Sequence, residues 1–164
     1  MEIRLATYED CRNLAILKKV VWETTYRGIY PNDKLDKYDI DYNENKFKDM
    51  IKKQSQKLFI VLNESKIIGY MSCGEILRAF DKYTHDIGLL YIIKEYQGKG
   101  IGSKLFEFAK NELKNQGITE FIVSCNKYNF SGQQFYSKMG GTIIKIDENN
   151  VDKSIPQVKF LFQI

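Results

Sequence analysis

The chain contains few of the residues from which metal sites and disulfide frameworks are built. Among its 164 residues there is one histidine, His85, and there are three cysteines, Cys11, Cys73 and Cys125. A histidine-based metal site needs more imidazoles, and the cysteines are odd in number with no CxxC spacing. We therefore expect no metal, and we expect three reduced, mostly buried thiols of a cytoplasmic protein.

Long apolar runs and a strong charge of one sign are also missing. No apolar segment approaches the roughly 18–20 residues that cross a bilayer, and the first residues, MEIRL, do not resemble a secretory signal. The formal net charge is only +4, and the lysines are scattered among acidic residues. This charge is too weak and too diffuse to indicate nucleic-acid binding. We predict a cytoplasmic protein that binds neither a membrane nor nucleic acid.

The overall composition, with 43% hydrophobic and 28% charged residues, is typical of a soluble globular protein. We expect one domain over residues 1–164. Hydrophobic periodicity predicts strands at 3–6, 58–62, 66–75, 84–93, 121–125, 142–146 and 158–162. It predicts helices from the Thr7–Asp10 cap to about Trp22, at 43–53, from 101 to the stop at Gly117, and at 130–138. This order favours an α/β fold around a mixed sheet.

The most informative segment lies between an apolar strand and an amphipathic helix. Gly98, Gly100 and Gly102 stand at alternate positions there and leave the turn without side-chain bulk. Backbone N–H groups can then point outward together at the positive end of the helix dipole, which is a site for phosphate. The alternative is a tight strand-to-helix turn that binds no ligand.

Two common phosphate motifs do not match this turn. A dinucleotide fold needs G-x-G-x-x-G and a P-loop needs G-x-x-x-x-G-K-[ST], whereas the chain reads Q-G-K-G-I-G over residues 97–102. The pattern Q-x-x-G-x-G in Gln97, Gly100 and Gly102 resembles the acetyl-CoA pyrophosphate signature of the GNAT superfamily of N-acetyltransferases. About 30 residues later, the segment 129–140, NFSGQQFYSKMG, is similar to that family's N-x-x-A-x-x-F-Y-x-x-x-G segment.

The resemblance covers nearly the whole chain and implies a fold, a cosubstrate and an activity. It implies a twisted, mostly antiparallel mixed sheet with helices on both faces, and direct transfer of an acetyl group from acetyl-CoA to a primary amine. In relatives, a strand splays at a bulge and its backbone meets the pantetheine arm; the matching residues are Leu90, Tyr91 and Ile92, whose leucine and isoleucine side chains belong to the core. The resemblance places the pyrophosphate on the turn of Gln97, Gly98, Lys99, Gly100, Ile101, Gly102 and Ser103, with added charge from Lys99 or Lys104.

Two residues of the second segment match functional positions of the family. Tyr136 matches a tyrosine that lies near the sulfur of CoA, and a phenol with a pKa near ~10 is protonated at neutral pH, as a general acid must be. The alternative is a packing role beside Phe135. Asn129 is expected to cap the helix and to touch the pantetheine arm, although capping alone explains an asparagine there.

The general base is less well defined. Asp86 lies on the strand that leads to the expected bulge, where related sequences often carry an acid, and counting by twos places Asp86, Gly88 and Leu90 on one face if no bulge intervenes. Glu23, Glu75 and His85 are weaker candidates. An acyl-cysteine relay through Cys73 or Cys125 is disfavoured because buried thiols are inert.

The amine acceptor is not identified by the sequence. We expect it to be a small-molecule or peptide amine bound by the irregular region 22–42, where Tyr26, Arg27, Tyr30 and Tyr38 are candidates, and by a loop at 76–83. The same tyrosines are also compatible with a purely covering role. Dimers are common in the family, so the resemblance is compatible with a homodimer, although the sequence alone does not define the oligomeric state. The alternative function is a non-catalytic acyl-CoA-binding module.

The chain departs from the family pattern at four positions. Gly132 replaces an alanine, Gly141 replaces a common aromatic, and Ile93 and Lys94 replace a polar residue and a frequent proline. Gly132 is expected to weaken its helix by up to ~1 kcal/mol, and Gly141 to loosen the last strands. None of these changes removes a candidate catalytic group.

Overall fold

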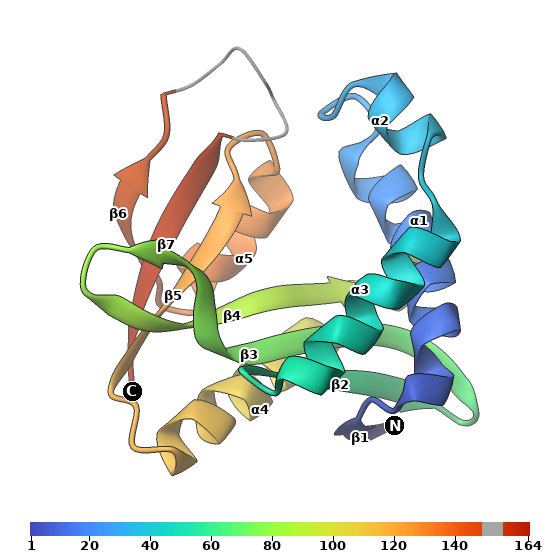
Figure 1. Ribbon diagram of the computed structural model, residues 1–164. Helices are drawn as coiled ribbons and strands as arrows, with labels where there is room; N and C mark the ends of the chain where they lie inside the picture. Colours follow the sequence, from blue (N-terminus) through green and yellow to red (C-terminus); the bar gives the residue numbers. More distant parts are fainter. Residues whose placement is uncertain (149–155) are drawn as a thin grey trace.

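A computed structural model describes residues 1–148 and 156–164, and its centre is one seven-stranded sheet (Figure 1). The strand order is β1-β2-β3-β4-β5-β7-β6. The strands are β1 Glu2–Leu5, β2 Gln56–Asn63, β3 Lys66–Phe80, β4 Tyr83–Ile92, β5 Glu120–Asn126, β6 Thr142–Ile146 and β7 Gln157–Gln163.

The sheet consists of two antiparallel parts joined by one parallel contact. β1 to β4 pair in antiparallel order, and so do β5, β7 and β6. The junction between β4 and β5 is parallel and has a single register pair, Asp86 opposite Ile122. The mixed, mostly antiparallel sheet that the resemblance implied is therefore confirmed.

Helices cover both faces of this sheet. They are α1 Cys11–Tyr26, α2 Asn32–Asp36, α3 Ile40–Lys53, α4 Ile101–Asn115 and α5 Phe130–Lys138. Tyr70 of β3 contacts Phe47 of α3, with ring centroids 5.5 Å apart. Phe59 of β2, which points to the other face, contacts Phe108 of α4 at 5.1 Å. In Figure 1, α1 and α3 accordingly cross one face of the sheet and α4 lies behind β3 and β4.

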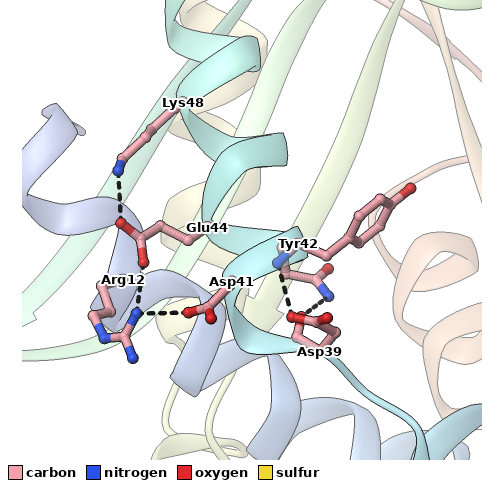
Figure 2. Close-up of polar contacts among 7 residues, drawn as sticks. Arg12, Asp39, Asp41, Tyr42, Glu44 and Lys48 are labelled. Carbon is pink, nitrogen blue, oxygen red and sulfur yellow. Dashed lines mark hydrogen bonds and ion pairs between the residues drawn. The ribbon is translucent and has the colours of Figure 1, made fainter.

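Short-range signals explain where several elements begin and end. Asp39 caps α3 because its carboxylate accepts a hydrogen bond from the N–H of Tyr42 at 2.9 Å. Polar contacts connect α1 to α3 (Figure 2): the Arg12 guanidinium donates to both Asp41 and Glu44, each at 2.9 Å. Within α3, Lys48 donates to Glu44 at 2.6 Å. Such ion pairs near the surface add little stability, and the two helices are held mainly by their apolar sides, which rest on the sheet.

The sequence predictions agree closely with most elements. The bounds predicted for α5 and β6 match those observed, and α1 continues four residues beyond Trp22. Two expectations were wrong. Region 24–42 contains the short helix α2, and the expected loop at 76–83 is instead the end of a long β3–β4 hairpin that turns at Asp81, which has φ +51°.

The predicted positions of the cysteines are confirmed, since Cys11, Cys73 and Cys125 are all free and buried. In the described ranges 1–148 and 156–164, no helix is long and apolar enough to cross a membrane. In the same ranges, no three His, Cys, Asp or Glu side chains are grouped closely enough to hold a metal ion.

Candidate active site

The glycine-rich turn connects β4 to α4 through the 3₁₀ helix Lys94–Tyr96. Gly98 and Gly100 have φ values of +72° and +77°, in the left-handed region where a side chain is strained. No N–H group from Gly98 to Ser103 donates to another described residue, and the first helical hydrogen bond runs from Lys104 N–H to Gly100 C=O at 3.1 Å. The turn therefore presents a row of free N–H donors at the positive end of α4.

Gln97 holds this turn against the end of β4. Its Nε2 donates to the carbonyl oxygen of Ile92 at 2.8 Å, and its backbone N–H donates to Lys94. The lysine beside it, Lys99, has its Nζ 5.3 Å from the centroid of the Tyr96 ring. One donor of the Gln97 side-chain amide thus holds the turn, and the backbone donors left for a ligand begin at Gly98.

Gly102 allows α5 to pack beside the first turn of α4. A Cβ atom at this position would lie 3.3 Å from Cε2 of Phe135 and 3.6 Å from Cδ1 of Ile92. The ring of Phe135 therefore lies against the turn, and the next residue, Tyr136, is brought to the same end of the sheet. Ile101 points inward and is buried in the core.

Beyond the register pair of Asp86 with Ile122, β4 and β5 separate. β4 stays paired with β3 as far as Ile92, but no residue from Ile87 to Ile92 has a register partner on β5. The carbonyl of Ile92 on this free edge is taken by Gln97. The expected splayed edge is present, and it carries Leu90, Tyr91 and Ile92, of which the leucine and the isoleucine pack into the core as predicted.

A bulge in β4 determines which side chains share a face. Ser72 pairs with Leu89 and Cys73 pairs with Ile87, so that Gly88 is an extra residue on β4. Residues directly opposite on antiparallel strands point to the same face. The condition for counting by twos, that no bulge intervenes, therefore fails at Gly88: Leu89 and Tyr91 share the face of Asp86, and Leu90 points to the opposite face.

Asp86 lies in a polar network of three side chains. Gln56 of β2 donates from Nε2 to Oδ1 of Asp86 and to the carbonyl of Glu75 at 3.1 Å, and its Oε1 accepts from the Ser72 hydroxyl at 2.7 Å. Burial raises the pKa of Asp86 from 3.8 to about 6, against the opposing effects of the Gln56 hydrogen bond and the Lys159 charge. A carboxylate with this pKa is ionised at neutral pH but retains appreciable proton affinity.

Tyr136 lies on the face opposite to Asp86. Its ring contacts Phe106 of α4 and Phe160 of β7, with centroids 6.4 and 5.8 Å away. Burial raises the pKa of Tyr136 far above its usual value of about 10, so that the phenol keeps its proton over the whole physiological pH range. Packing and a protonated hydroxyl are thus both present at this residue.

Asn129 caps α5, as predicted, because its Oδ1 accepts from the N–H of Gly132 at 3.1 Å. The glycine at position 132 fits a crowded site, since a Cβ atom would lie 2.8 Å from Nδ2 of Asn129 and 3.0 Å from Sγ of Cys125, and these side chains would have to shift. Gly141 is similarly confined, with Cζ of Phe162 2.6 Å from its Cβ position. These two departures from the family pattern therefore coincide with close packing, and the expected weakening of the helix and of the last strands stays a prediction.

Aromatic side chains from α1 and the following segment gather beside Tyr91. Tyr26 shares a hydrogen bond of 3.3 Å between its hydroxyl and that of Tyr91, and it stacks on Tyr30 with centroids 4.3 Å apart. Trp22 meets Tyr26, Tyr30 and Tyr38 edge-on at 5.6–6.0 Å. The candidates of region 22–42 are thus brought together with β4, except that Arg27 binds Glu23 and Asp36 at the surface.

The weaker base candidates lie in different surroundings. Glu23 is exposed and paired with Arg27. Glu75 is also exposed, and it lies opposite His85 in the register pair next to that of Gly74 with Asp86. His85 Nδ1 is engaged with the Thr84 hydroxyl at 2.9 Å. Burial raises the pKa of the Cys73 and Cys125 thiols to about 12, which keeps them protonated and disfavours a cysteine relay.

Comparison with known proteins identifies the family. The model of the acetyltransferase (GNAT) family matches residues 14–141, which is most of the chain. The chain belongs to this family. A curated relative, spermidine N(1)-acetyltransferase of Thermoplasma acidophilum, is 26% identical over 165 residues, covering 98% of each chain.

Solved structures of GNAT acetyltransferases share the fold of this chain. PaiA N-acetyltransferase from Thermoplasma acidophilum, solved with coenzyme A, superimposes with a TM-score of 0.78 at 24% identity over 99% of this chain and 98% of that one. YncA from Salmonella typhimurium, solved with acetyl-CoA, gives a TM-score of 0.74 at 20% identity over 99% and 93%. The resemblance inferred from the two sequence motifs is confirmed.

The GNAT motifs did not reveal Gln56, which lies 30 residues before Asp86 and supplies its hydrogen-bond donor. No periodic or motif signal marks this residue. The β4 bulge, in contrast, is indicated in the sequence: Gly88 interrupts an apolar strand, and an isolated glycine in a strand is typical of a bulge.

Proposed function

We propose that this protein transfers the acetyl group of acetyl-CoA to a primary amine, with both substrates bound at once. The observation that carries the proposal is the row of free N–H groups from Gly98 to Ser103 beside an unpaired edge of β4. Phosphate oxygens suit the first group of donors, and an extended pantetheine arm suits a free strand edge, whose backbone groups it can bind as an added strand would.

In the proposed reaction, the general acid and the general base lie on opposite faces of the sheet. Bound acetyl-CoA supplies a thioester whose C–S bond breaks as the new C–N bond forms, which moves the acetyl group from sulfur to nitrogen. Tyr136, on the face of α4 and α5, gives its phenolic proton to the departing sulfur. Asp86, on the face of α1 and α3, accepts the proton that nitrogen loses, directly or through one water molecule. In this proposal the thioester and the amine meet where β4 and β5 separate, beyond the register pair of Asp86 with Ile122.

The proposed base sets a pH dependence. Asp86 must be ionised to accept a proton, and its pKa is about 6. We therefore expect kcat/KM to rise with pH through about 6, and Asp86→Asn to remove this acid limb together with roughly 100-fold or more of the rate. A pH–rate profile of the variant that keeps the limb would assign the base to another residue.

The acceptor is best sought by a direct assay. Purified protein with acetyl-CoA would be given spermidine, lysine, kanamycin and a peptide with a free amino terminus, and release of the free CoA thiol would be followed with a thiol reagent. Spermidine comes first because the relative from Thermoplasma acidophilum carries that name. Thiol release that depends on an amine supports the proposal, whereas tight acetyl-CoA binding without release for any amine would favour a CoA-binding module.

A further inference from the structure

Gln56 occupies an unusual position for a polar side chain. It is the first residue of β2 and is 2% exposed, while Ser72 beside it is fully buried. Its amide is saturated on both sides: Nε2 donates to Asp86 and to the Glu75 carbonyl, and Oε1 accepts from Ser72. This buried amide is held in one orientation, because flipping it would turn its oxygen toward two other acceptors, the Asp86 carboxylate and the Glu75 carbonyl.

The backbone around Gln56 is shaped to admit this side chain. A Cβ atom on the bulged residue Gly88 would lie 2.8 Å from Oε1 and 3.2 Å from Nε2 of Gln56. A Cβ atom on Gly74, the register partner of Gln56, would lie 2.9 Å from its Cα. Two glycines thus leave the space through which the amide reaches from β2, past β3, to Asp86 on β4.

We propose that Gln56 is a positioning residue, held by Ser72, that keeps the Asp86 carboxylate turned toward the acceptor amine. This inference rests on the role of Asp86 in the proposed function. A neutral amide suits the task because it orients the carboxylate without the full charge of an arginine or lysine, which would hold the carboxylate ionised and remove its affinity for the proton.

The charged surroundings of Asp86 come from several strands. Lys159 of β7 lowers its pKa, and it donates to the Ser124 hydroxyl of β5 at 2.9 Å. Cys73 of β3 points to the opposite face, as do Glu75 and His85, which form the neighbouring register pair. Gln56 is therefore the uncharged donor on the same face, and its loss changes the carboxylate without removing a charge.

The contact is tested without turnover by measuring the Asp86 carboxyl directly. Carbon-13 NMR of labelled aspartate side chains follows its titration, and the Asp86→Asn spectrum assigns the resonance. Gln56→Met, similar in length but without a donor, should raise the pKa of Asp86 from about 6 by about one unit. The matched control is Gln116→Met, which also loses a donor to a backbone carbonyl but lies at the exposed end of α4. An unchanged Asp86 titration in Gln56→Met overturns the proposal.

The effect of Gln56 on catalysis is tested by a pH–rate profile. The acceptor is whichever of spermidine, lysine, kanamycin and the peptide is acetylated most rapidly. The acid limb of kcat/KM should move to higher pH by the same one unit in Gln56→Met, with kcat lowered several-fold even on the plateau and the Kd for CoA within twofold of the original. A moved Asp86 titration with an unmoved rate profile overturns the proposal while leaving acetyl transfer intact. Absence of turnover with every amine refutes the proposed function itself.

Ser72→Ala is a second variant that tests the proposal if Gln56→Met does not fold. It removes the hydroxyl that orients Oε1 but keeps the donor to Asp86. A shift of the same sign and smaller size, with an unchanged circular dichroism spectrum, supports the network. A shift of Asp86 in the opposite direction contradicts it.

Discussion

The two sides of the proposed site are built in different ways. The cofactor side, residues 97–103 with the free edge of β4, consists of backbone groups from one continuous segment. The acceptor side consists of side chains from α1, β2, β3 and β4, held by a network that contains Asp86, Gln56 and Ser72. The first depends on glycine conformations, whereas the second depends on buried contacts between distant residues. We expect substitutions on the two sides to separate cosubstrate binding from proton transfer.

The largest separation is expected at Tyr136. Replacing it by phenylalanine removes only the hydroxyl and keeps the ring contacts with Phe106 and Phe160. We expect kcat to fall by about 100-fold or more, because a positioned general acid contributes at least that much. The Kd for acetyl-CoA should stay within twofold, measured by calorimetry.

The control for this change is Tyr42→Phe, at a tyrosine that is 58% exposed on α3. It should leave kcat unaltered. A normal rate in Tyr136→Phe would restrict Tyr136 to a packing role.

The cofactor side is broken most directly at Gly100. Gly100→Val places a β-branched side chain at φ +77°, where it causes a strain of about 2 kcal/mol. We expect the backbone of the turn to change conformation in response, which moves its N–H groups out of position. We expect the affinity for CoA to fall roughly 30-fold.

Gly117→Val provides a matched control at the other end of α4. Its φ is +79°, and, like Gly100, it has open space around the Cβ position. Both variants should lose similar stability in urea, but only Gly100→Val should lose affinity for CoA. Equal affinities in the two variants would mean that the turn does not bind the pyrophosphate.

On the acceptor side, we expect the buried charge of Asp86 to lower the free energy of unfolding at neutral pH. Its pKa in the folded protein is raised by burial from 3.8 to about 6. Below about pH 3.8 the carboxyl is protonated both folded and unfolded and carries no penalty; above about 6 the folded state holds a buried charge. Asp86→Asn should therefore stabilise the protein by about 1–2 kcal/mol at pH 7.5, less than the full pKa difference implies because the side chain is partly exposed.

This gain should appear as a Tm increase of roughly 3 °C or more at pH 7.5 and vanish below pH 4. Asp49→Asn, at an exposed position on α3, is the control. A lower Tm for Asp86→Asn at pH 7.5 would show that the carboxylate stabilises the fold, contrary to its assigned environment.

The smallest expected effect concerns Lys159. Its charge lowers the pKa of Asp86, so Lys159→Met should raise that pKa by a few tenths of a unit, less than Gln56→Met does. High salt should diminish the difference between Lys159→Met and the original protein, because mobile ions screen a partly exposed charge. A shift larger than that of Gln56→Met would make charge, and not the amide, the main influence on Asp86.

The sequence predicted those features that short segments determine. The glycine turn, the cap at Asn129 and the bounds of α5 follow from local patterns, and the two family motifs indicated the sheet. The acceptor side was only partly predictable. Asp86 was found by its strand, but the alternation of faces changes at Gly88, and the contact with Gln56 joins positions 30 residues apart.

The remaining errors have similar physical causes. The hairpin at 76–83 has no strong turn motif; it is extended because, after an irregularity that follows the Glu75–His85 pair, β3 and β4 pair again at Phe80 and Tyr83. The short helix α2 was hidden in a segment rich in polar residues, and its buried residue is Leu35 alone. Tertiary pairing and packing decide such segments, and neither is visible in a local pattern.

A titration of nitrogen-15-labelled protein with CoA, followed by amide NMR, tests the account most directly. We expect the largest chemical-shift changes at the N–H groups of Gly98 to Ser103 and along the free edge of β4 from Leu89 to Ile92, and small changes on α3. Saturable shifts confined to other elements, with these amides unmoved, would contradict the assignment of the glycine turn and the strand split to acetyl-CoA.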